Sequence, residues 1–242
     1  TAAPAPFEKA ADSGGTAKDD VRKAIQLKLA ADQGDATAQY ALAVCHMEGR
    51  GVAGDEARAA ALFKLAADQG EASAQGALGM LHLEGRGVPQ DYERAAALFT
   101  LAADQGDAKA QFDLGKMHYD GHGVAQDVVR TAALFTLAAD QGYARAQFNL
   151  ALMYLEGRGV AKDSARAAAL FTLAANQGDA MAQVNLGMMY RLGQGVAQDD
   201  VRAAELLTLA ADQGDVRALY ELGSMHALGK GVPQDDVRAA AL

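Results

Sequence analysis

The chain has few of the residues that cross-link or interrupt a fold. It has a single cysteine, Cys45, so no intramolecular disulfide can form. The cysteine content is therefore compatible with both a reducing and an oxidising compartment. Proline is scarce at 4 residues, and 50% of the chain is hydrophobic, which excludes a disordered linker and supplies enough apolar material for a packed core. No apolar run approaches the roughly 20 residues that a transmembrane helix needs.

Clustered positive charge is also missing. Lys and Arg number 22 against 31 Asp and Glu, for a formal net charge of -9. A surface that binds nucleic-acid phosphates needs grouped Lys and Arg side chains. The charge balance therefore predicts that nucleic acid is not a partner.

The sequence begins at Thr1, and the residues through Pro6 are small and uncharged. Two interpretations stay open. This end is either a mature terminus left after removal of a targeting peptide, which would place the protein outside the cytosol or in an organelle, or the start of a piece of a longer chain.

An internal repeat dominates what the sequence does contain. The tripeptide Asp-Gln-Gly begins at Asp32 and again at Asp68, a period of 36 residues. Other residues keep the same period. One column is arginine: Arg22, Arg58, Arg94, Arg130, Arg166, Arg202 and Arg238. Another is glycine: Gly49, Gly85, Gly121, Gly157, Gly193 and Gly229.

Each period has the pattern of two helices. In the copy that starts at Glu71, apolar residues recur at helical spacing, which predicts a first helix over about 72–84. Glu71 suits the N-cap, and Gly85 tolerates the left-handed turn that ends a helix. Asp91 predicts the start of a second helix, which Gly106 ends. Short links require the two helices to pack antiparallel.

A single hairpin cannot bury both of its apolar faces, whereas stacked copies can. The repeat therefore predicts an all-α solenoid, an α-α superhelix of 36-residue helix-turn-helix repeats. We expect one solenoid domain over residues 1–242. Its predicted parts are an N-terminal partial repeat (1–34, with a short helix near 6–12), full repeats at 35–70, 71–106, 107–142, 143–178 and 179–214, and a C-terminal partial repeat at 215–242.

The copy from Ala108 to Val124, followed by Asp127 and Arg130, resembles the Sel-one-like repeat, a relative of the tetratricopeptide repeat. The Ala-x-Ala, Leu-Gly, Gly-x-Gly-Val and Asp-x-x-Arg columns all match, over about residues 16 to 242. This chain departs from the family pattern with Arg for the usual Lys of the last column. The usual Tyr becomes His at His46, His82, His118 and His226. The resemblance implies a right-handed superhelix used as an adaptor or assembly scaffold.

Candidate chemical groups favour structural roles. His118 and His122 have the spacing of a helical metal pair, but Gly121 lies between them, and His118 occupies a column that holds Tyr elsewhere. Gly-x-Gly-Val follows a helix in every copy, unlike a phosphate loop. Cys45 shares its column with Leu and Met, so we expect it in the core. We therefore predict no enzyme activity, metal or cofactor.

A partner protein is expected on the concave face. In the tetratricopeptide pattern the first helix of each hairpin lines that face, and comparing the copies selects columns that vary. The predicted groove residues are Tyr40, Val44, Met47, Met80, Phe112, Tyr119, Arg145, Phe148, Leu152, Leu155, Met188, Arg191 and Tyr220. The alternative is that these side chains pack against the next repeat. Because Glu48, Glu84, Asp120 and Glu156 give way to Leu192 and Leu228, the C-terminal half should be the more apolar.

The leading hypothesis is a scaffold or adaptor that binds a peptide or protein surface in this groove. The main alternative is a structural subunit or assembly factor built permanently into a large multiprotein complex. A hydrolase is the remote third, because no catalytic set of residues is visible. The last residue, Leu242, falls partway through a predicted second helix, so either further chain or a partner is expected to cover Ala239 and Ala240.

Overall fold

The computed structural model describes residues 16–241, and within that range all regular structure is helical. The helices are α1 (Ala17–Asp32), α2 (Ala36–Glu48), α3 (Glu56–Asp68), α4 (Ala72–Glu84), α5 (Tyr92–Asp104), α6 (Ala108–Asp120), α7 (Val128–Asp140), α8 (Ala144–Glu156), α9 (Ser164–Asn176), α10 (Ala180–Leu192), α11 (Asp200–Asp212), α12 (Val216–Leu228) and α13 (Asp236–Ala241). The predicted all-α solenoid of repeated helix pairs is confirmed. The short helix predicted near 6–12 and the exposure of Leu242 lie outside the described residues.

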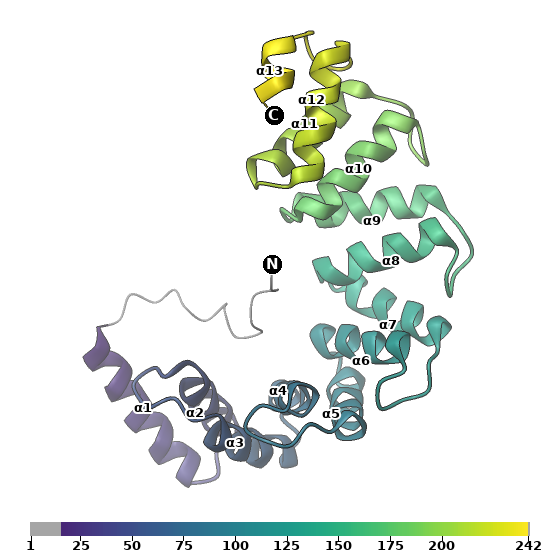
Figure 1. Cartoon of the computed structure of the whole chain (residues 1–242). Helices are drawn as coiled ribbons and strands as arrows, with labels where there is room; N and C mark the ends of the chain where they lie inside the picture. Colours follow the sequence, from purple (N-terminus) through teal and green to yellow (C-terminus); the bar gives the residue numbers. More distant parts are fainter. Residues whose placement is uncertain (1–15, 242) are drawn as a thin grey trace. The chain divides into compact units, whose positions relative to one another are not determined.

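The helices group into two compact units. Unit 1 ends at Gln126 and contains α1 to α6, and unit 2 begins at Asp127 and contains α7 to α13. Within each unit, every helix packs against the next one along the chain, as the ribbon of Figure 1 shows. The assignment of all repeats to one domain stays a prediction.

Local residue choices set the helix ends where the sequence predicted them. The carboxylate of Glu71 accepts a hydrogen bond from the Ser73 backbone N–H at 3.3 Å, and α4 follows. Gly85 has a φ of 70° and ends that helix in the left-handed region. Asp91 then caps α5 by accepting from the Arg94 N–H at 2.9 Å. Both predicted helices of this copy are confirmed.

Small and large side chains alternate in the core of each repeat. In unit 2 the ring of Phe171 is fully buried among alanines such as Ala167 and Ala174, which let the helix axes approach closely. The same position holds Phe63 and Phe99 in unit 1, and Leu207 in α11. Cys45 is buried, as its Leu and Met column predicted.

A buried glutamine joins three consecutive helices in the repeats, and the sequence analysis did not single it out. In unit 2 the Gln183 side-chain amide donates to the Ala175 carbonyl at 3.3 Å, which links α10 to the end of α9. Its amide oxygen accepts from the Gln213 side chain at 2.9 Å, just after α11. Gln213 belongs to an Asp-Gln-Gly tripeptide, so the most regular motif of the sequence has a role in binding one repeat to the next.

We expect Gln183→Leu to lower the free energy of unfolding by about 1–3 kcal/mol, because the substitution leaves the Ala175 carbonyl and part of the Gln213 amide without their buried partners. Urea unfolding followed by circular dichroism measures the change. Asn185→Ala, which changes a side-chain amide on the same helix without touching this network, serves as the control. Equal stability of Gln183→Leu and the parent chain would show that the glutamine is dispensable.

None of the helices formed by residues 16–241 has the length and apolar character that crossing a membrane requires.

Candidate protein-binding surface

Three of the predicted groove residues lie in the core. Met80, Phe112 and Phe148 are only 8%, 5% and 9% exposed. The Phe148 ring packs on Phe171 of the following helix, with 5.6 Å between ring centroids. Their placement on an open groove was wrong, because all three side chains are buried, Phe148 against the second helix of its own repeat.

A further group of predicted groove residues is half-buried and packs on the core edge. Tyr40 tilts against Phe63 with 5.5 Å between centroids, and burial raises the pKa of its hydroxyl. The others in this group are Val44 and Met47 in unit 1, and Leu152 and Leu155 in unit 2. Tyr119 is also half-buried. These side chains therefore pack on the core of the repeats, as the alternative to an open groove predicted, and keep only part of their surface exposed.

Four predicted groove residues remain. Arg145 is exposed on α8, whereas Met188, Arg191 and Tyr220 lie on α10 and α12 of unit 2. On the first helices of the described repeats, large exposed apolar side chains occur only on α10 and α12. They are Met181, Leu192, Val216, Tyr220 and Leu228. Tyr220 is 74% exposed, whereas Phe112 and Phe148 in the same column are buried. The expectation of a more apolar C-terminal half therefore holds for these helices.

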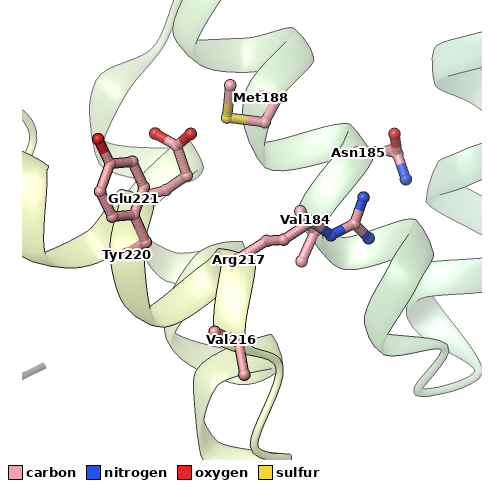
Figure 2. A pocket seen from close by; sticks show the side chains of 7 residues that line it. All are labelled: Val184, Asn185, Met188, Val216, Arg217, Tyr220 and Glu221. Atoms are coloured by element: carbon pink, nitrogen blue, oxygen red, sulfur yellow. The ribbon is translucent and has the colours of Figure 1, made fainter.

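A pocket of about 450 Å³ lies between α10 and α12. Figure 2 shows Val184, Asn185 and Met188 on α10 facing side chains of α12. The α12 side is lined by Val216, Arg217, Tyr220 and Glu221. The Arg217 side chain extends toward Asn185, while Tyr220 and Glu221 lie nearer Met188 (Figure 2). We call the exposed surface of these two helices, with this pocket, the α10–α12 face.

An ion pair holds the two helices together beside the pocket. The Arg191 guanidinium of α10 donates to the Glu221 carboxylate of α12 at 2.6 Å. Both side chains are mostly buried, at 26% and 20% exposure, so solvent screens the pair less than a surface pair. Arg191 was predicted as a groove contact. The ion pair also fixes the spacing of α10 and α12, and Arg191 lines the second cavity of this helix pair, so its role as a groove contact stays a prediction.

A second cavity, of about 480 Å³, lies toward the other end of the same helix pair. Leu192 and Leu228 line it together with the polar side chains of Gln198 and Lys230. Both leucines are exposed. The α10–α12 face thus offers two neighbouring hollows of similar size.

Three residues that line the pocket lie outside the columns of the predicted groove residues: Asn185, Val216 and Glu221. Asn185 and Glu221 belong to one column, which reads Ala41, Ala77, Asp113, Asn149, Asn185 and Glu221. That column varies between copies, as the columns of the predicted groove residues do, so the same comparison had the signal to find it. Val184 shares a column with the predicted Tyr220, and Arg217 shares one with the predicted Arg145, but neither was itself among the predicted groove residues.

The histidines at this position tie their first helices, α2, α4, α6 and α12, to the loops that follow. His118 Nδ1 lies 3.1 Å from the Ala125 carbonyl, and because a carbonyl only accepts, Nδ1 must carry the proton. His226 makes the same bond to Pro233 at 3.2 Å in unit 2. His122 stacks on Tyr92, with 5.1 Å between centroids, so its ring and that of His118 have separate contacts. This geometry favours the structural interpretation over a metal pair.

Where tyrosine replaces histidine, the repeat arginine contacts it. The Tyr190 hydroxyl accepts from the Arg202 guanidinium at 3.1 Å and raises the pKa of that group. Arg202 also lies 3.7 Å from the Asp199 cap carboxylate. Arg166, Tyr154 and Asp163 repeat this arrangement. Because both guanidinium groups are well exposed, these contacts contribute little to stability.

The single thiol is poorly suited to nucleophilic chemistry. Burial raises the pKa of the Cys45 thiol, so the neutral form prevails at pH 7. The reactive species of cysteine is the thiolate. The geometry therefore agrees with the core role that the sequence predicted.

Comparison with known proteins agrees with the repeat and the fold. The Sel1 repeat model matches six consecutive segments, residues 36–71, 72–107, 108–143, 144–179, 180–215 and 216–242. No curated protein matches at the sequence level. Among solved structures, the chain is similar to c5321, a protective antigen of uropathogenic Escherichia coli strains with an SLR fold, at 35% identity and a TM-score of 0.86.

That similarity covers 90% of this chain but 47% of the E. coli chain, so the chain spans about half the length of that relative. A Sel1 repeat protein from Oxalobacter formigenes is similar at 26% identity and a TM-score of 0.76, over 92% of this chain and 94% of the other. Proteins with these repeats generally mediate protein–protein interactions. On six matching repeats and a helix-pair fold, the chain belongs to the Sel1 repeat family.

Proposed function

We propose that the chain is a protein-binding scaffold whose partner docks on the α10–α12 face. The observation that supports this is the concentration of exposed apolar side chains on these two first helices. Val216 and Tyr220 line the pocket of about 450 Å³, and Leu192 and Leu228 line the second cavity. Large apolar side chains that surround a hollow are typical of interaction sites. Burying one such side chain contributes roughly 1.5–3 kcal/mol, so a few of them support a stable complex.

A second candidate has its own observation. The second helices carry one half-exposed leucine each, at Leu65 and Leu101 in unit 1, and at Leu137, Leu173 and Leu209 in unit 2. Within unit 2, the three leucines on the second helices suit a subunit embedded in a larger complex. That function requires partner contact on these leucines rather than on the α10–α12 face.

Photo-crosslinking separates the two candidates. The photoreactive amino acid p-benzoylphenylalanine replaces Tyr220 in one variant and Leu173 in another, and each variant is irradiated in extract of the source organism. We expect a protein adduct at position 220, absent at position 173, and lost when Met188→Asp is added to the first variant. Circular dichroism confirms that Met188→Asp keeps its helices.

Adducts at position 173 alone would support the complex-subunit function and contradict docking on the α10–α12 face. Adducts at neither position would contradict both candidates. An adduct at position 220 that persists with Met188→Asp would show contact with the tyrosine but not with the pocket.

A further inference from the structure

The charged side chain that stays available at the pocket is positive. Glu221 is neutralised by Arg191 at 2.6 Å, which removes the one acidic side chain of the pocket lining from competition for a ligand. Arg217 remains, and its side chain is 59% exposed. Its nearest acidic neighbour, Asp215, lies 3.9 Å away and already accepts two backbone hydrogen bonds at the start of α12. The pocket therefore presents a guanidinium to an incoming group.

Asn185 adds a second polar group at the same end. Its side-chain amide donates to the Met181 carbonyl at 2.7 Å, which fixes the orientation of the carboxamide on α10. One amide hydrogen and the carboxamide oxygen stay available for a ligand. Figure 2 shows Arg217 reaching from α12 toward this carboxamide. A guanidinium beside an amide N–H is a donor arrangement that suits a carboxylate.

The same position carries a cation two repeats earlier. Arg145, Met181 and Arg217 are the second residues of α8, α10 and α12. Asp caps α10 and α12, whereas Tyr143 occupies that position before α8 and makes no side-chain cap hydrogen bond. Arg145 therefore lacks the nearby cap carboxylate that Arg217 has. Across these three helices the order is cation, apolar side chain, cation.

From this order, we infer that the partner supplies an acidic segment with an apolar side chain between carboxylates. The inference rests on the proposed function and names the chemistry of its partner. The apolar side chain enters the pocket over Val184, Met188 and Val216. One carboxylate meets Arg217 and Asn185, and a second meets Arg145. The chain as a whole has a net charge of -9, so it repels a uniformly anionic polymer, whereas a short acidic segment placed at these two cations is attracted.

A random 12-residue peptide library displayed on phage tests this chemistry. It is selected on the parent chain and counter-selected on Met188→Asp. We expect enriched peptides to combine Asp or Glu with Leu, Phe, Ile or Met. The best peptide is then synthesised with a fluorescent label, and its affinity is measured by anisotropy. Arg217→Gln and Arg145→Gln should each weaken binding by about tenfold or more, since charge-assisted hydrogen bonds are lost.

Arg166→Gln is the matched control, because it removes the same charge from α9 at a side chain that is 68% exposed. It should leave the affinity unchanged within about twofold. Enrichment of basic or uncharged peptides, or equal losses for Arg166→Gln and Arg217→Gln, would overturn the inference. So would competition by a single-stranded oligonucleotide that depends on both arginines. The crosslink at position 220 decides the proposed function separately, because that readout does not depend on partner charge.

Discussion

Replacing Gly195 by alanine should lower the free energy of unfolding by about 3–5 kcal/mol. Gly195 has a φ of 73°, and a Cβ there would lie 2.2 Å from the Ser164 carbonyl oxygen. The clash is with the backbone of the first turn of α9, in the preceding repeat. Rotation of a side chain therefore cannot relieve it. Urea or thermal unfolding of the whole chain measures the loss.

Gly178→Ala is the matched control. Gly178 has a φ of 88°, but nothing lies within 4 Å of where its Cβ would be. It should cost only about 1–2 kcal/mol, the conformational penalty alone. If both substitutions cost the same, close approach of consecutive repeats at Gly195 would not be what requires the glycine.

Replacing Phe171 by alanine should cost about 3–5 kcal/mol, because a fully buried ring leaves a cavity that the surrounding alanines cannot fill. Phe171→Leu should cost about 1 kcal/mol, since Leu207 fills the equivalent buried position in the next repeat. Denaturant unfolding of both variants gives the comparison. A leucine variant as unstable as the alanine variant would show that the ring shape, rather than its volume, is needed.

The fold follows from the sequence because its determinants are local and recur. The cap at Asp91 and the left-handed turn at Gly85 act within one helix end, and their 36-residue period identifies the repeat. The glutamine network was not predicted, because Gln183 and Gln213 meet across 30 residues of chain, a distance that helix periodicity does not report.

The candidate site was predicted only in part. Comparing copies identifies a column that varies, but exposure within a column depends on what the neighbouring helix covers. Phe148 is buried on Phe171, whereas Tyr220 in the same column is open to solvent. Pattern alone also could not assign Arg191 to an ion pair, because its partner Glu221 lies in the next repeat.

Methionine methyl NMR tests the central claim, that a partner docks on the α10–α12 face, most directly. The chain has 8 methionines. Met181 and Met188 lie on the face, Met189 and Met225 lie in the core of the same unit, and Met47 packs on the core of unit 1. The chain, with 13C-labelled methionine methyl groups, is mixed with unlabelled extract of the source organism. We predict shifts or broadening at Met181 and Met188 and little change at Met47. Perturbation at Met47 alone, or at no methionine while the position-173 variant crosslinks, would contradict the account.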